Sequence, residues 1–231
     1  MVDSKQSLDG QDFTVAPRDV LNTRISDILG NRFIAKRGVT EREKEETTLT
    51  EECTADVFEG TKYVGLFFGA SWCPPCKIMM KSLKNFYTDA NLEERTIEIV
   101  LVSSDRSQEQ WQQHHATQPW LSLEWGDPQA DKLRMKYDVR SVPKLIILDS
   151  TTGFTITEKG RKDLSDDVKG VYTTWDKLHV IRKAHAVHEA EQEAIAAGQK
   201  LEREYKEKQK KLEDERKAQM ITEENKEPQL N

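Results

Sequence analysis

Residues 63–76 of the chain read YVGLFFGASWCPPC. The YVGLFFG part is an apolar run bounded by small or polar residues, which is typical of a strand buried on both faces of a sheet. Pro74 and Pro75 suit the first turn of a helix, where the amide hydrogens that proline lacks would have no partner. The sequence therefore predicts a buried strand that leads into a helix, with Cys73 and Cys76 at the helix start.

A cysteine pair in this position predicts thiol–disulfide chemistry. The free amide groups and positive partial charge of a helix N-terminus stabilise a thiolate and lower its pKa. We expect Cys73 to attack a disulfide of another molecule and Cys76 to resolve the mixed disulfide. Zinc binding is the alternative for this spacing, but zinc needs two further ligands, and no second Cys or His pair lies at a suitable spacing. We therefore expect no metal site, and we expect Cys53 to be an ordinary thiol.

Helical and strand patterns alternate over most of the chain. Further strands are predicted over 97–102, 144–148 and 154–157, the last two as a hairpin, and helices over 19–29, 108–117, 128–137 and 163–169, with one helical turn over 50–58 and a charged loop at 41–46. Parallel crossover units followed by an antiparallel hairpin predict an α/β fold, with a mixed central sheet flanked by helices.

Composition divides the chain into a core-forming part and a charged extension. Of 231 residues, 36% are hydrophobic and 33% are charged, with a net charge of −6. We expect a disordered segment over 1–18, one domain over 19–175 and a charged helical tail over 176–231. Since neither the domain nor the tail is basic, charge gives no reason to expect binding to nucleic acid or to a membrane surface.

The N-terminus has no signal-peptide pattern, and no stretch approaches the roughly 20 apolar residues of a membrane span. Three cysteines do not make a disulfide framework. A reducing compartment, the cytoplasm, is therefore expected.

The tail predicts one long helix. Residues 175–225 contain no proline, and Glu and Lys recur four residues apart in the order that supports a helix, as in Glu202–Lys206 and Glu213–Lys217. The apolar positions are too sparse for a sustained heptad seam. Two interpretations stay open: a solvated charged helix, or a docking or coiled-coil segment for a protein partner over 176–225, which would place the protein at the cytoskeleton or a cilium.

Three further segments form a joint pattern together with the Trp-Cys-Pro-Pro-Cys motif: IVLVSSDR at 99–106, PWL at 119–121 and DVRSVP at 138–143. Together they resemble the tryparedoxin and nucleoredoxin branch of the thioredoxin superfamily, over residues 19–175. The resemblance implies a thioredoxin-like fold and Cys73 as the nucleophile. It also implies a cis peptide at Pro143, with the backbone of Val142 offered to the substrate.

By the same resemblance, Trp72 and Trp120 line the docking surface together with Pro74 and Pro75 of the motif. The chain departs from thioredoxins at Phe67, where they carry an acid; the tryparedoxin branch also has an aromatic residue there. Ile78-Met79-Met80 replaces the usual Phe-Thr-Pro, so the helix lacks its kinking proline.

Lys144 stands where the family usually has threonine, and we hypothesise that it lowers the pKa of Cys73 or favours acidic partners. Asp105 and Arg106 follow a predicted strand end, where they form a surface ion pair or tune the thiols. The adjacent His114 and His115 point about 100° apart on a helix and are expected at the surface.

The sequence thus predicts a thiol–disulfide oxidoreductase that reduces protein disulfides, without a cofactor of its own. It has no dinucleotide-binding glycine-rich turn, so electrons are expected from an external thiol donor. The reduction potential decides between net reduction and isomerisation, and the sequence leaves that open. The alternative is a structural or adaptor subunit of a larger assembly, anchored by the tail helix.

Overall fold

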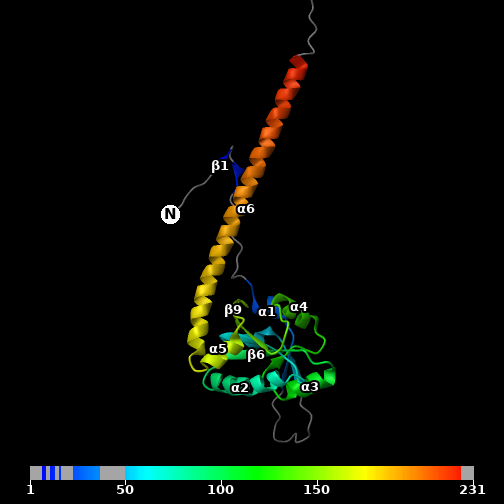
Figure 1. Cartoon of the computed structure of the whole chain (residues 1–231), viewed down its shortest axis with the longest axis vertical. Coiled ribbons are helices and arrows are strands. Elements are labelled where there is room, and N and C mark those ends of the chain that lie inside the picture. Colours follow the sequence, from blue (N-terminus) through cyan, green and yellow to red (C-terminus); the bar gives the residue numbers. More distant parts are fainter. Residues whose placement is uncertain (1–6, 9–10, 14–15, 17–22, 37–49, 225–231) are drawn as a thin grey trace, which may run out of the picture. The chain divides into compact units, whose positions relative to one another are not determined.

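The structure is a computed structural model (Figure 1), and it describes residues 7–8, 11–13, 16, 23–36 and 50–224. The chain divides into two compact units. The larger comprises residues 21–184, and the smaller comprises residues 1–20 together with 185–231.

The larger unit is built on a mixed sheet. Among its described residues the strand order is β4-β3-β7-β6-β5-β8-β9. The strands are β3 (Phe33–Lys36), β4 (Thr50–Cys53), β5 (Tyr63–Gly69), β6 (Ile97–Ser103), β7 (Leu121–Ser122), β8 (Lys144–Asp149) and β9 (Thr155–Thr157). Strand β5 is central, parallel to β6 and antiparallel to β8. All of β5 is buried, which confirms the interpretation of its apolar run.

Helices cover both faces of this sheet (Figure 1). They are α1 (Ile25–Leu29), the 3-10 turn η1 (Ala55–Phe58), α2 (Pro74–Ala90), α3 (Gln108–Ala116), α4 (Pro128–Lys136), α5 (Gly160–Asp166) and the first turns of α6 (Val171–Glu224). Leu66 and Phe68 of β5 pack towards α1 and α4. Phe67 faces the opposite layer, formed by α2, α3 and the start of α6. The predicted fold class is confirmed.

Helix starts follow the local chemistry that the sequence shows. The Asp127 side chain accepts a hydrogen bond from the Gln129 amide, and Pro128 occupies the first position of α4. Ser107 caps α3 in the same way, through the amide of Gln110. Helix α2 also begins with two prolines, directly after Cys73.

The structure corrects several predicted elements near the N-terminus of this unit. Residues 50–58 are strand β4 followed by η1, not one helical turn. Strands β3 and β7 went unpredicted because they are short and because the contact that pairs them joins residues far apart in the sequence. Of the helix predicted over 19–29, residues 25–29 are helical. Its first residues, and the predicted loop at 41–46, lie outside the described residues.

Helix α6 starts earlier and runs longer than predicted, with 54 residues. Its first turns belong to the core of the larger unit, because Val171 and Trp175 are buried against α2 and β5. Trp175 makes edge contacts with the rings of Tyr63 and Phe86. The larger unit therefore extends to residue 184, beyond the predicted boundary at 175.

The smaller unit contains the rest of α6 and a two-stranded ladder of β1 (Ser7–Leu8) and β2 (Gln11–Asp12). The segment predicted to be disordered therefore includes paired strands. The ring centroid of Phe13 lies 5.2 Å from that of Tyr205 on α6. The expected ion pairs Glu202–Lys206 and Glu213–Lys217 are present.

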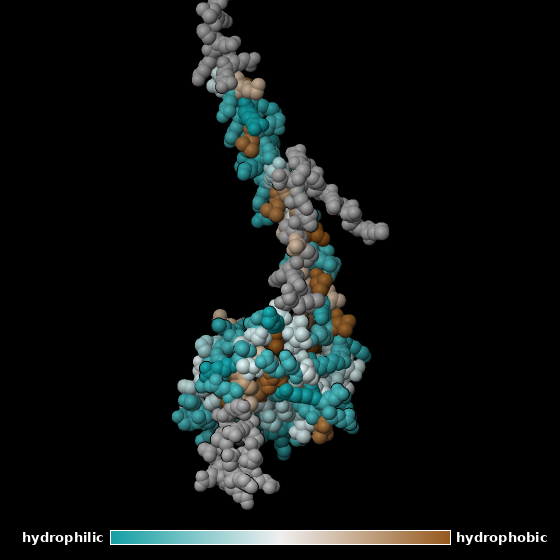
Figure 2. All heavy atoms as spheres, turned by 180° about the vertical axis from the view of Figure 1, so that it is seen from behind, coloured by the Kyte–Doolittle hydropathy of each residue, from teal (hydrophilic) through white to brown (hydrophobic). Residues whose placement is uncertain are grey.

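The surface of α6 is mostly hydrophilic, with isolated hydrophobic side chains (Figure 2). Among the described residues, no helix combines the length and the apolar character needed to cross a membrane.

Candidate active site

The two cysteines of the motif lie together at the start of α2. Cys73 is the N-cap residue, and Cys76 is in the first turn; the two form a disulfide with a Cα–Cα distance of 5.2 Å. The backbone amide of Cys76 points at the Cys73 sulfur, with 3.2 Å between N and Sγ. A thiolate at Cys73 would receive this hydrogen bond and the positive partial charge of the helix start. The arrangement is suited to thiol–disulfide exchange.

A cis peptide bond lies opposite the disulfide. The Val142–Pro143 bond is cis, as the resemblance implied. The carbonyl oxygen of Val142 is 3.7 Å from the Cys73 sulfur. Ala70, Cys73, Cys76 and Val142 pack together, and only 4% of Cys73 is exposed. The backbone of Val142 therefore borders the position at which a partner sulfur must approach Cys73.

Trp72 lies at the edge of this site, with 46% of its surface exposed. Its indole Nε1 donates a hydrogen bond to the Ser104 carbonyl at 3.1 Å, and the Arg106 guanidinium lies over its ring, 5.1 Å from the centroid. Pro74 and Pro75 are exposed beside it at the start of α2. The structure thus brings Trp72, both prolines, Val142 and Pro143 together around the disulfide.

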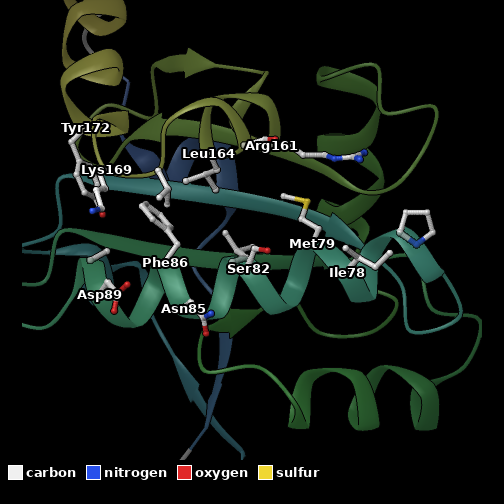
Figure 3. A pocket seen from close by; sticks show the side chains of 15 residues that line it. Ile78, Met79, Ser82, Asn85, Phe86, Asp89, Arg161, Leu164, Lys169 and Tyr172 are labelled. Atoms are coloured by element: carbon white, nitrogen blue, oxygen red, sulfur yellow. The ribbon is translucent and has the colours of Figure 1, made fainter.

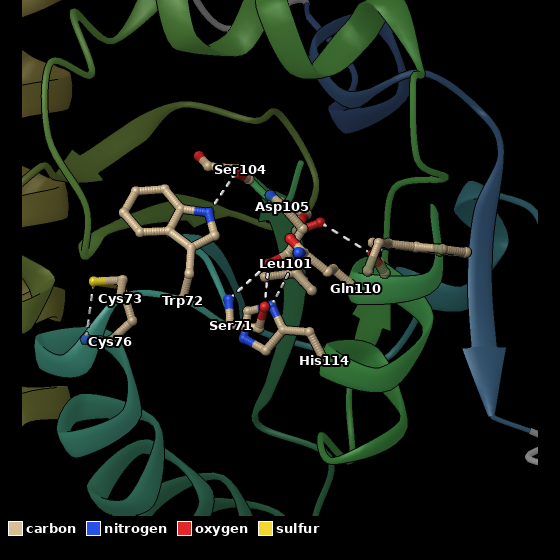
Figure 4. A network of polar contacts seen from close by, with 12 residues as sticks. Ser71, Trp72, Cys73, Cys76, Leu101, Ser104, Asp105, Gln110 and His114 are labelled. Atoms are coloured by element: carbon tan, nitrogen blue, oxygen red, sulfur yellow. Dashed lines mark hydrogen bonds and ion pairs between the residues drawn. A yellow bond between two sulfur atoms is a disulfide. The ribbon is translucent and has the colours of Figure 1, made fainter. Parts of the chain in front are cut away.

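A buried polar network holds the turn before the cysteines (Figure 4). One oxygen of Asp105, Oδ1, accepts hydrogen bonds from the Ser71 amide and the Ser71 hydroxyl, both at 2.7 Å. The other, Oδ2, accepts from the Ser103 hydroxyl at 2.7 Å and lies 2.8 Å from His114 Nδ1. Asp105 therefore connects β6, α3 and the active-site turn.

The charge of Asp105 is stabilised within this network. Burial alone would raise the pKa of its carboxyl, but the hydrogen bonds from His114, Ser71 and Ser103 outweigh burial and hold the pKa well below its ordinary value. Asp105 is therefore a permanent carboxylate at neutral pH. It does not pair with Arg106, so the surface ion pair considered for these two residues is wrong.

Sequence reasoning missed Ser71 and His114. Both His114 and His115 were expected at the surface, and both are buried. His115 stacks on Trp111 and lies 3.0 Å from the Trp120 carbonyl oxygen. The spacing of Trp111, His114 and His115 is the signal that could have shown this, because residues three and four apart share one face of a helix.

Trp120 does not line the surface. Its side chain is 1% exposed, and it packs in the core against Phe67 and Tyr87. The prediction that it contributes to a docking surface is therefore wrong. Phe67, at the position where thioredoxins carry an acid, is part of the same buried aromatic cluster. This position of β5 therefore faces the apolar core.

Lys144 uses its ammonium group within the fold. Its Nζ donates to the Tyr137 carbonyl at 2.6 Å and forms an ion pair with Glu158 at 3.0 Å. These contacts direct the ammonium group towards α4 and the β9 end. They offset its charge, and nothing in them supports the hypothesis that Lys144 lowers the pKa of Cys73.

Metal-ligating groups do not gather near the cysteines. Within the described part of the chain, no three His, Cys, Asp or Glu side chains lie together in a way that could hold a metal ion. The Cys53 thiol lies 3.7 Å from the Phe33 carbonyl oxygen, on the edge strand β4.

Comparison with known sequences gives consistent relatives. A family model described as thioredoxin-like matches residues 60–154. Nucleoredoxin of Xenopus laevis is 35% identical over 128 residues, which is 55% of this chain and 30% of that protein. Nucleoredoxin of Danio rerio is 38% identical over 51% of this chain and 28% of that protein. Tryparedoxin of Trypanosoma brucei brucei is 31% identical over 49% of this chain and 79% of tryparedoxin. The chain thus matches less than a third of the length of these nucleoredoxins.

Solved structures give the same result. Tryparedoxin I of Crithidia fasciculata superposes with a TM-score of 0.53 and 27% identity, over 63% of this chain and 93% of that one. Tryparedoxin I of Leishmania major gives a TM-score of 0.51 and 30% identity, over 62% and 89%. With the cysteine pair at the start of α2 and the cis-proline opposite, the fold defines a thioredoxin-like oxidoreductase. The chain belongs to this family, in the branch of the tryparedoxins and nucleoredoxins.

Proposed function

We propose that this protein is a thiol–disulfide oxidoreductase that reduces disulfides of other proteins through Cys73 and Cys76. The observation that carries the proposal is the contact between the Cys76 amide and the Cys73 sulfur at the helix start. This hydrogen bond favours the thiolate form of Cys73, and the thiolate is the reactive form in disulfide exchange.

The electron balance of the cycle is simple. In the reduced protein, the Cys73 thiolate attacks one sulfur of the substrate disulfide, and the other substrate sulfur leaves as a thiolate that takes up a proton. Cys76 then attacks Cys73 in the mixed disulfide and releases the second substrate thiol. Two electrons have passed to the substrate, and the Cys73–Cys76 disulfide seen in the structure is the oxidised product.

We propose that an external dithiol returns the protein to its reduced state, and that this takes place in a reducing compartment such as the cytoplasm. The exposed Trp72 and the Val142 carbonyl beside Cys73 support a protein substrate, because they offer a surface and a backbone acceptor next to the reacting sulfur.

The test is reduction of insulin disulfides by the full chain, with dithiothreitol as the electron source. Cys73→Ser should abolish activity above the uncatalysed rate. Reduced Cys76→Ser, mixed with insulin after the dithiothreitol has been removed, should accumulate a covalent mixed disulfide, visible by mass spectrometry. Cys53→Ser is the matched control and should keep the wild-type rate. Undiminished activity in Cys73→Ser would refute the proposal.

A further inference from the structure

A groove runs along α2 on the side away from α3. It lies between α2, α5 and the start of α6, with a volume of about 820 Å³ (Figure 3). Pro75, Ile78 and Met79 of α2 form part of one wall, and Leu164 and Val168 form part of the other. The volume is in the range of ligand-binding pockets, so it accommodates several side chains of a partner.

The walls of this groove expose apolar side chains. Ile78 is 74% exposed and Val168 is 48% exposed, and Met79 and Leu164, which also line the groove, are partly buried. Isolated apolar residues on a surface are ordinary, but apolar residues gathered along a concave surface mark an interaction site. A partner that binds in the groove gains affinity by removing these side chains from water.

The groove is continuous with the active site. Pro75 belongs to the Cys-Pro-Pro-Cys motif and also lines the groove, and Ile78 follows one turn later on the same helix. A chain segment that lies in the groove therefore ends beside the Cys73–Cys76 disulfide. The molecule best placed to supply that segment is the one whose own disulfide reacts there.

The charged residues of the groove indicate which charge the bound segment should carry. Arg161 and Lys169 line it, and neither forms an ion pair with a described residue, whereas the neighbouring Lys162 pairs with Asp166. Figure 3 shows Lys169 and Asp89, which carry opposite charges, towards the Tyr172 end and Arg161 towards the Ile78 end. At the Ile78 end, one turn of α2 from Pro75, the groove therefore carries the cation Arg161 without an ion-pair partner among the described residues.

We propose that the groove binds the segment of the substrate protein that adjoins its disulfide, and that this segment is apolar with an acidic residue facing Arg161. The inference rests on the proposed function and adds a class of substrate to it. Selection among disulfides then depends on the residues beside the substrate cysteine as well as on the disulfide itself.

The test uses synthetic disulfide peptides with fluorescent labels, reduced by the full chain with dithiothreitol. One peptide carries Asp-Leu-Leu-Phe beside its cysteine, one carries Lys-Leu-Leu-Phe and one carries Asp-Ser-Ser-Ser. Each is made in two versions, with the segment before or after the cysteine. Bis(2-hydroxyethyl) disulfide, which is too small to fill the groove, measures the reaction of the dithiol alone.

Wild-type protein should show the lowest KM for the acidic apolar peptide. Ile78→Lys should raise that KM about tenfold, since residues at the centre of an interface commonly lose this much or more. Arg161→Glu should invert the preference between the Asp and Lys peptides. The small disulfide should react at the wild-type rate in both variants. Met135→Lys on α4 and Lys162→Glu on α5 are matched controls outside the groove lining and should change no KM.

Equal KM values for the three peptides, or unchanged values in Ile78→Lys, would overturn the proposal while reduction of the small disulfide leaves the oxidoreductase function intact. If wild-type protein reduces neither the peptides nor the small disulfide, the proposed function fails, and the groove proposal fails with it. A change of oligomeric state in Ile78→Lys, measured by sedimentation without a change in KM, would show that the groove holds a second copy and would also overturn it.

Discussion

Replacing Asp105 by asparagine should destabilise the larger unit and loosen the turn that carries the cysteines. Asparagine has the same shape as aspartate, but one of its oxygens becomes an amino group. Each oxygen of Asp105 accepts two hydrogen bonds: Oδ1 from the Ser71 amide and hydroxyl, and Oδ2 from Ser103 and His114. In either orientation, the new amino group therefore faces two groups that donate to Asp105 in the wild type.

The expected magnitude follows from these contacts. A hydrogen bond to a charged group contributes about 1.5–3 kcal/mol, and losses within one network are not additive. We therefore expect the free energy of unfolding to fall by about 3 kcal/mol. For a unit of this size, each kcal/mol shifts the Tm by roughly 2–4 °C, so the Tm should fall by about 6–12 °C.

Thermal unfolding of the oxidised full chain, followed by circular dichroism, measures this difference. Asp131→Asn is the matched control, because Asp131 is exposed and its ion pair with Arg134 is expected to contribute about 0.5 kcal/mol or less. A Tm of Asp105→Asn within the error of that control would refute the reasoning.

The stability difference between the wild type and Asp105→Asn should depend on pH. The pKa of Asp105 is depressed in the folded protein, so its stabilisation is complete above the ordinary aspartate pKa of about 3.9. It is lost as the pH falls through the folded-state value. The stability gap between wild type and Asp105→Asn should therefore be constant around neutral pH and narrow below about pH 4.

Three further predictions concern the larger unit. Trp175→Ala should lower the free energy of unfolding by about 3–5 kcal/mol in denaturant titrations, because the fully buried indole leaves a cavity. Gly153→Ala should destabilise by about 1–2 kcal/mol by the same measurement, since φ is +68° and a Cβ there would clash with Cδ1 of Ile28. Burial, with a smaller effect of Asp89, raises the pKa of Tyr172 to about 12. An ultraviolet titration of the wild type should therefore show a phenol that ionises near pH 12 and that is absent from Tyr172→Phe. Because the ordinary tyrosine pKa is about 10, the free energy of unfolding of the wild type should fall as the pH rises above about 10.

Local pattern was sufficient for the elements around the active site. The apolar run of β5 and the two prolines of α2 specify a buried strand and a helix start without reference to the rest of the chain. Strands β3 and β7 were missed because they are defined by pairing: Ile34 opposes Ser122 across a long sequence separation. Two or four residues carry too little periodicity to reveal such a contact.

In the candidate site too, local sequence predicts some residues and long-range pairing determines the others. Cys73 and Cys76 follow from their spacing, whereas the Asp105 network depends on the parallel register of β5 and β6, which pairs Gly69 with Ser103. That register brings Ser71 to Asp105, and it cannot be read from either segment alone. Trp120 shows the opposite failure, because a family motif marked it as functional and its position in the core makes it structural.

The position of Trp72 has a practical consequence. Its indole is adjacent in sequence to Cys73, half-exposed, and fixed by its hydrogen bond to the Ser104 carbonyl (Figure 4). Disulfides quench the fluorescence of nearby indoles more strongly than thiols do, so the emission of Trp72 should rise when the cysteines are reduced. The protein therefore contains its own optical reporter of oxidation state, and a Trp72→Phe variant identifies which part of the signal comes from the active site.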